Sequence, residues 1–234
     1  HKKLIRALRN SLIVFIMSIV VISPWIYRNT KLMGQLTYVS NNGGIVLYIN
    51  NNSQNHLGRW MPAADVEDSI VNKPEYKKAN RTQQNKILSS AAKKWIKSHP
   101  VDFLKLGFKR LFSTYFCSDD VMYSTYGSGV NKSYIHTLFI IDNKIRAIVF
   151  LSTIIYVLLY FVRTLYSIFK GKSYELDKFK LYLVVLFFMF TSVYFVTEGQ
   201  GRYSFPEIFI AVYCCYFSLK CLLYLLLKVK GIRS

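Results

Sequence analysis

Residues 181–227 read LYLVVLFFMFTSVYFVT, EGQGRYSFP and EIFIAVYCCYFSLKCLLYLLL, which are two long apolar runs joined by a short charged turn at residues 198–206. Each run approaches the roughly 20 residues with which an α-helix crosses the hydrocarbon of a bilayer. The turn carries an acid, an arginine and a tyrosine. Such groups are costly to desolvate at a membrane surface, so they usually face a polar ligand or a partner charge. The alternative interpretation is a solvated hairpin between two helices, and the spacing alone favours neither.

Two further apolar runs lie upstream, from about Ser11 to Tyr27 and from about Ala147 to Val162. The whole chain is 52% hydrophobic and 16% aromatic, and its mean hydropathy of +0.22 is unusual for a soluble domain of 234 residues. We therefore expect an all-α membrane protein with about four transmembrane helices. Pro24 can break the first of them, and Trp25 suits the membrane interface.

The lysines and arginines in short flanks predict the orientation, because such residues gather on the cytoplasmic side of a membrane. They form three clusters around the apolar runs, namely Lys2, Lys3, Arg6 and Arg9, then Arg163, Lys170, Lys172, Lys178 and Lys180, then Lys228, Lys230 and Arg233. Residues 1–27 are then a basic cytoplasmic flank and the first transmembrane helix, and residues 28–144 are an extracytoplasmic loop domain. Residues 145–234 are three transmembrane helices with a short external turn at 198–206 and a cytoplasmic C-terminus.

The net charge of +19 is largely accounted for by this arrangement and by a basic outer loop, so no nucleic-acid partner is expected. Three of the four cysteines, Cys214, Cys215 and Cys221, lie in the last apolar run, and Cys117 lies in the outer loop. The four histidines are scattered. We therefore expect neither a disulfide framework nor a metal site.

The outer loop is expected to be mostly helical with a small β or irregular portion. Gln35–Ser40 and Ile45–Ile49 suit two short strands around an Asn-Asn-Gly-Gly turn. A charged stretch at about Pro74–Ser98 suits a helix. Val101–Phe116 alternates phenylalanine and leucine with lysine and arginine, which predicts an amphipathic helix. That helix either rests on the membrane surface, the interpretation that we favour, or packs against the loop's own core.

Several short motifs follow one another along the chain. They are Pro24-Trp25-Ile26-Tyr27-Arg28-Asn29, Gly34, Ser40-Asn41-Asn42-Gly43-Gly44, Asn50-Asn51-Asn52, Ala92-Lys93-Lys94-Trp95-Ile96-Lys97-Ser98-His99-Pro100 with Phe103, Leu104 and Lys109, and finally Glu198 with Arg202, Tyr203 and Pro206. In this order they resemble the C-terminal part of bacterial GT-C membrane glycosyltransferases of the protein O-mannosyltransferase and aminoarabinose-transferase type. The resemblance spans most of the chain.

The resemblance implies a hexosyl- or mannosyltransferase-like enzyme of the bacterial cell membrane. It would move a sugar from a polyprenyl-phosphate donor to a protein, lipid or cell-wall polymer acceptor at the outer face, without a tightly bound cofactor. Family members carry their catalytic aspartate in the first external loop, and no part of this chain matches that region. The chain also opens on His1 without an initiator methionine. We therefore expect a piece of a longer protein, with the catalytic acid upstream, and assign no catalytic residue here.

Five residues are candidates for binding the donor: Arg28, Asn29, Glu198, Arg202 and Tyr203. The two arginines suit the lipid phosphate, because a guanidinium binds phosphate through two parallel hydrogen bonds. In this hypothesis Glu198 orients Arg202, and Tyr203 packs on the sugar or the isoprenoid. The plainer alternatives are an interfacial anchor at Arg28, a turn at Asn29 and an ion pair between Glu198 and Arg202.

Two functions without catalysis stay open. A lipid-phosphate binder or transporter would use the same arginines, although transporters usually place polar residues near mid-membrane, where these runs carry almost none. An accessory subunit would instead bind another membrane protein through the outer loop. A partner that co-purifies with a protein lacking transfer activity would favour the accessory subunit.

Overall fold

The computed structural model describes residues 2–38, 40–117, 120–172 and 176–229. Over these ranges the chain is all-α and forms no strand, which confirms the predicted fold class. Packing divides it into two compact units. The first unit contains the described residues up to Gln54 together with Met61–Ser98, and the second contains Asn55–Trp60 and the described residues from His99 onward.

Four segments are long and apolar enough to cross a membrane, as the four apolar runs predict. They are Leu8–Met33, Lys132–Phe169, Lys178–Val196 and Gly201–Tyr224. One segment belongs to the first unit and three belong to the second. The protein is therefore membrane-embedded by the length and composition of its helices.

The first unit begins with α1 (Lys2–Met33), which continues through Pro24. The expectation that proline breaks this helix is wrong. A proline has no N–H, so it cannot donate to the carbonyl four residues earlier, that of Val20. The hydroxyl of Ser23 donates to the Val20 carbonyl instead, at 2.8 Å. The helix therefore keeps this acceptor satisfied and runs on to Met33.

The rest of the first unit is a small helical cluster. It consists of α2 (Gly43–Asn50), the 3₁₀ turns η1 (Ala63–Asp65) and η2 (Ile70–Asn72), α3 (Pro74–Lys78) and α4 (Arg81–Ser98). The helix predicted at Pro74–Ser98 is thus two helices, separated at Ala79 and Asn80. The buried side chains of α4 are Leu88 and Ala92, and they pack with Tyr48, Ile49 and Val66.

The strand predicted at Ile45–Ile49 is wrong, because these residues lie in α2. A short apolar run reads alike in a buried strand and in a buried helix. The amides of Asn50, Asn51 and Asn52 donate to carbonyls of the same helix, those of Val46, Leu47, and Tyr48 and Ile49 respectively, which secures its last turn. Between Gly34 and α2, the described residues are irregular, as the alternative to a strand allowed.

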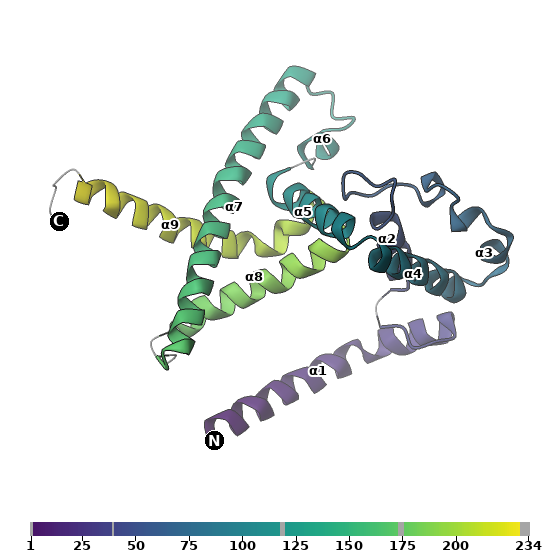
Figure 1. Ribbon diagram of the computed structural model, residues 1–234, viewed down its shortest axis with the longest axis horizontal. Helices are drawn as coiled ribbons and strands as arrows, with labels where there is room; N and C mark the ends of the chain where they lie inside the picture. Colours follow the sequence, from purple (N-terminus) through teal and green to yellow (C-terminus); the bar gives the residue numbers. More distant parts are fainter. Residues whose placement is uncertain (1, 39, 118–119, 173–175, 230–234) are drawn as a thin grey trace. The chain divides into compact units, whose positions relative to one another are not determined.

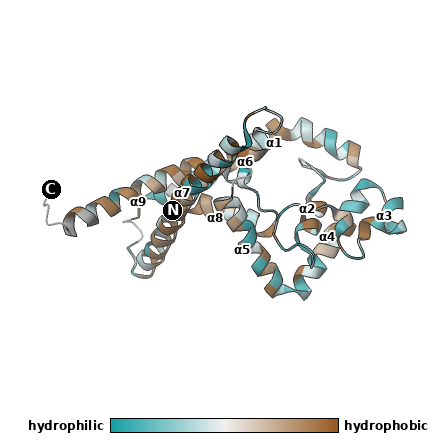
Figure 2. Ribbon diagram, turned by 90° about the horizontal axis from the view of Figure 1, so that it is seen from above, coloured by the Kyte–Doolittle hydropathy of each residue, from teal (hydrophilic) through white to brown (hydrophobic). Residues whose placement is uncertain are grey.

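The second unit is built from α5 (Pro100–Phe116), α6 (Asp120–Ser124), α7 (Lys132–Phe169), α8 (Lys178–Val196), the 3₁₀ turn η4 (Gly201–Glu207) and α9 (Ile208–Val229). Within this unit α7 lies across α9 and meets the start of α8 (Figure 1). Hydrophobic residues run along all three helices (Figure 2). The hydroxyl of Thr153 donates to the Ala211 carbonyl at 3.1 Å and ties α7 to α9.

An aromatic core holds α5 against this bundle. The Tyr115 ring centroid lies 5.1 Å from that of Phe150 on α7 and 5.4 Å from that of Phe187 on α8. The opposite face of α5 stays exposed at Leu104, Phe108 and Phe112. The amphipathic helix predicted here is confirmed, and one of its faces packs on the bundle. That the exposed face rests on a membrane stays a prediction.

Candidate functional site

The turn between α8 and α9 gathers three of the five residues predicted to bind a donor. Glu198 is buried, and it accepts a hydrogen bond from the Tyr203 hydroxyl at 3.0 Å and another from the Gln200 amide. The guanidinium carbon of Arg202 lies 5.5 Å from the centroid of the Tyr203 ring, and the side chain is exposed. Among the residues that the structure describes, Glu198 and Arg202 form no ion pair. Tyr203 therefore contacts both residues, Glu198 through its hydroxyl and Arg202 beside its ring.

Arg146 of α7 holds this turn in place through hydrogen bonds. Its Nη1 donates to the Ser204 hydroxyl at 2.7 Å, to the Thr114 carbonyl at 3.0 Å and to the Gly201 carbonyl at 3.3 Å. The bonds reach both α5 and η4. One cation thus fixes the backbone from which Arg202 projects, and hydrogen bonds from a charged donor are about twice as strong as neutral ones.

Arg110 of α5 fastens the other end of the same turn. Its Nη1 donates to the carbonyls of Phe195 at 2.6 Å and Val196 at 3.4 Å, which end α8 and have no partner within the helix. Burial lowers the pKa of Arg110 to about 10. The backbone approaches closely here, because a Cβ on Gly199 would lie 2.4 Å from the Arg110 carbonyl oxygen. The Gly199 N–H donates to the Gly58 carbonyl at 3.1 Å.

The turn ends at a buried acid, Glu207, directly before α9. Glu207 is fully buried, and its Oε1 accepts from the Tyr115 hydroxyl at 3.3 Å. The same hydroxyl lies 2.7 Å from the Thr191 hydroxyl. Burial, followed by the neighbouring Glu207, raises the pKa of Tyr115. Tyr115 therefore stays a neutral donor and links α5, α8 and η4 through one oxygen.

The other two predicted residues, Arg28 and Asn29, belong to α1 in the first unit. The Arg28 guanidinium carbon lies 5.3 Å from the centroid of the Trp25 ring, and its Nη1 donates to the Asn29 amide oxygen at 3.4 Å. An arginine stacked on tryptophan is typical of an anchor at a membrane interface, as the plainer alternative allows. Asn29 is buried.

Comparison with protein-family models, curated proteins and solved structures gave no match. The chemistry of the site therefore has to be argued from its own groups. Within the described ranges, no three His, Cys, Asp or Glu side chains cluster as metal ligands do. The turn offers an exposed guanidinium on a fixed aromatic ring, a pair that suits an anionic group attached to an apolar or sugar moiety.

Sequence reasoning missed the groups that hold the turn. Arg110 lies one turn after the buried Leu106, so helical spacing places it on the packed face of α5. Arg146 comes directly before the apolar run from Ala147, and Glu207 begins the last run. Charges at the ends of apolar runs usually face water or headgroups, so nothing in the sequence predicts that these three are enclosed by packing.

Proposed function

We propose that this chain is the C-terminal portion of an integral membrane glycosyltransferase, which moves a sugar from a polyprenyl-phosphate donor to an acceptor at the outer face of the membrane. The motif order supports the proposal, as do the four candidate spans. The single observation that carries it is the exposed Arg202 guanidinium, held on the Tyr203 ring at the end of a membrane helix. A rigid cation at that depth suits a phosphate whose hydrocarbon chain lies in the bilayer.

The proposed chemistry is an inverting displacement at the anomeric carbon of the sugar. An acceptor hydroxyl attacks this carbon, the bond from carbon to phosphate oxygen breaks, and the lipid phosphate leaves with the electron pair. A carboxylate in the upstream part of the longer protein takes the acceptor's proton. Arg202 stabilises the charge that develops on the leaving phosphate through two parallel hydrogen bonds. This assigns Arg202 to the leaving group and no residue of the chain to proton transfer.

The other candidate residues take supporting roles in this proposal. The Tyr203 ring packs against the sugar or the first isoprene unit, and its hydroxyl bond to Glu198 keeps that ring in place. Arg28 and Asn29 belong to the first unit, and their part in binding the donor stays a prediction. The bonds from Arg110 and Arg146 keep the turn from relaxing away from the ligand.

Transfer measured in membranes tests this function. Membranes from cells that express the complete native protein are given radiolabelled mannosyl-phosphoryl polyprenol, and release of polyprenyl phosphate is followed. Arg202→Ala is expected to lower the rate by about 100-fold, the usual effect of losing one donor to a developing anion. Arg163→Ala, which removes an exposed arginine from the far part of α7, is the matched control and should leave the rate unchanged. Equal rates for the two variants would reject the proposal.

The alternative function is a lipid-phosphate-binding or accessory membrane protein. It is favoured if the complete protein binds polyprenyl phosphate but releases none from the sugar-linked form in any membrane tested. An accessory role is favoured if the protein neither binds nor transfers and a second membrane protein co-purifies with it.

A further inference from the structure

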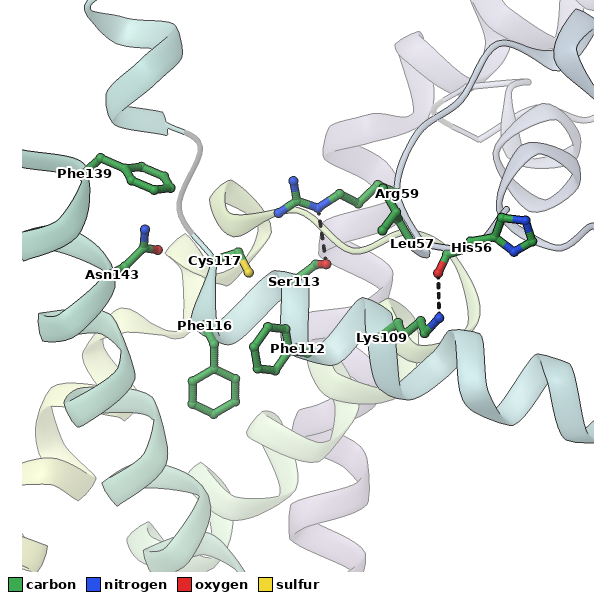
Figure 3. A pocket seen from close by; sticks show the side chains of 10 residues that line it. All are labelled: His56, Leu57, Arg59, Lys109, Phe112, Ser113, Phe116, Cys117, Phe139 and Asn143. Atoms are coloured by element: carbon green, nitrogen blue, oxygen red, sulfur yellow. Dashed lines mark hydrogen bonds between the residues drawn. The ribbon is translucent and has the colours of Figure 1, made fainter. Parts of the chain in front are cut away.

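A pocket of about 580 Å³ opens in the second unit beside α5 (Figure 3). Its walls come from the Asn55–Trp60 segment, from α5 and the residue after it, and from α7. The lining residues are His56, Leu57, Arg59, Lys109, Phe112, Ser113, Phe116, Cys117, Phe139 and Asn143. This volume falls in the range of about 300–1,000 Å³ that is usual for small-molecule sites. None of the five residues predicted to bind a donor lines it.

The pocket combines cations with aromatic rings. Arg59 Nε donates to the Ser113 hydroxyl at 3.3 Å, and Lys109 Nζ donates to the His56 carbonyl at 2.8 Å. These bonds hold both side chains at the pocket wall, Arg59 beside Ser113 and Lys109 beside His56 (Figure 3). No aspartate or glutamate is among the lining residues. The pocket therefore favours an anion.

Three aromatic residues also line the pocket. Figure 3 shows Phe112 and Phe116 projecting from α5 and Phe139 lying opposite on α7. Phe112 is 59% exposed, so the pocket keeps an open apolar wall. Exposed aromatic surface beside fixed cations is complementary to an amphiphile with a negative head and a hydrocarbon chain.

The pocket lies close to the strongly apolar part of α7. Phe139 and Asn143 lie one to two turns before the apolar run that starts at Ala147. Arg146 of the same helix binds the turn at the start of the last candidate span. A lipid whose head binds in this pocket therefore has apolar helix surface within one to two turns for its hydrocarbon chain.

We propose that this pocket binds a lipid with a phosphate monoester head. Arg59 and Lys109 bind the phosphate, and Phe112, Phe116 and Phe139 contact the first part of the hydrocarbon chain. The pocket is a second lipid subsite beside the one assigned to Arg202. The proposal concerns binding alone and does not depend on sugar transfer.

Cys117 provides the readout, because it lines the pocket and is partly exposed. The protein in dodecyl maltoside is treated with N-ethylmaleimide, and labelling of each cysteine is followed by peptide mass spectrometry. Hexadecyl phosphate at about ten times its Kd is expected to slow labelling of Cys117 by about tenfold.

Two matched ligands and two variants make the test decisive. Hexadecanol and inorganic phosphate at equal concentration should give no protection. Arg59→Gln combined with Lys109→Gln should abolish protection by hexadecyl phosphate, measured as the ratio of the labelling rates of the same variant with and without lipid. Lys105→Gln, an exposed position one turn away on the same helix, should keep protection.

Each other outcome overturns the proposal in a different way. Equal protection by hexadecanol would make the pocket a plain apolar cleft, and protection by inorganic phosphate alone would make it a site for soluble anions. No protection by any ligand would leave no lipid site here. Transfer plays no part in these measurements, so their failure would not bear on Arg202.

Discussion

The two units use similar apolar side chains in opposite ways. Along α1 of the first unit they point outward, as with Val14 at 66% and Phe15 at 61% exposed. In α7 of the second unit they line a core, as with Phe150 at 3% and Val157 at 1% exposed. A membrane helix without a packed face is stabilised by hydrocarbon alone, whereas the second unit also depends on shape complementarity between helices. The candidate turn between α8 and α9 lies in this second unit, where packed helices hold Arg110 and Arg146 against its backbone.

The largest expected difference between the two units is tested by replacing one phenylalanine in each unit with alanine. Phe150→Ala should lower the free energy of unfolding by about 3–5 kcal/mol, because it leaves a cavity among packed rings. Phe15→Ala should change it by less than about 0.5 kcal/mol, since it removes no packed neighbour. Thermal unfolding of the purified protein in one detergent measures both. Similar shifts for the two variants would show that α1 packs as tightly as α7.

A second variant tests whether buried charge holds the turn. Arg110→Met keeps the length of the side chain but leaves the last carbonyls of α8 without their donor. We expect a loss of about 3 kcal/mol, typical of a buried charged hydrogen bond. Lys105→Met on the exposed face of α5 is the control and should be neutral within about 0.5 kcal/mol. If Arg110→Met unfolds at the temperature of its control, the turn is held by apolar packing instead.

The first unit has its own test of close packing, between α2 and α4. A Cβ on Gly44 would lie 2.0 Å from the Asn85 carbonyl oxygen, whereas a Cβ on Gly43 would meet nothing within 4 Å. Gly44→Ala should therefore destabilise this unit by about 1–3 kcal/mol. Gly43→Ala is the matched control and should have little effect. Protease resistance of α4, compared across the two variants, reports on the stability of this unit.

The smallest effect is expected at the edge of the second unit. Asp177 caps α8 by accepting from the backbone N–H groups of Phe179 at 2.9 Å and Lys180 at 3.3 Å, and these bonds lower the pKa of its carboxyl. A lowered pKa means that the capping contribution is present at neutral pH and is lost as pH falls through the folded pKa. Asp177→Ala should therefore lower the melting temperature by more at pH 7 than near pH 2, because a protonated carboxyl accepts hydrogen bonds more weakly than a carboxylate. Asp177→Asn should keep most of the cap at both values. An Ala variant with the same deficit at both pH values would exclude this ionisation.

Patterns that depend on length and composition were predictable. An apolar run of about 20 residues is long enough to cross a bilayer as a helix, which pairs its backbone N–H and C=O groups within the segment. The four candidate spans therefore follow from the sequence. Hydrogen bonds between side chains and nearby backbone groups were not predictable in this way. In α1 the Ser23 hydroxyl donates to the carbonyl that Pro24 cannot reach. In α2 three asparagine amides donate to carbonyls of the last turn, and residues Ile45–Ile49 are helical where a strand was predicted.

The candidate site divides in the same way. Arg202 and Tyr203 became candidates because a charge and an aromatic ring between two apolar runs are conspicuous, and their role stays a prediction. The sequence did not single out Arg110, Arg146 and Glu207, because only the packing of α5, α7 and η4 shows which charges are enclosed and what they bind. A local pattern identifies the exposed groups of a turn more readily than the groups that hold the turn in place.

The measurement that tests the central claim most directly is the transfer kinetics of Arg202→Lys in the complete native protein. Lysine keeps the charge but loses the two parallel hydrogen bonds of the guanidinium. We predict that kcat/KM falls by roughly 10- to 100-fold, as expected when charged hydrogen bonds worth about 1.5–3 kcal/mol are lost. Arg163→Lys should leave it unchanged. Wild-type kinetics for Arg202→Lys would contradict the claim that this arginine binds the leaving phosphate.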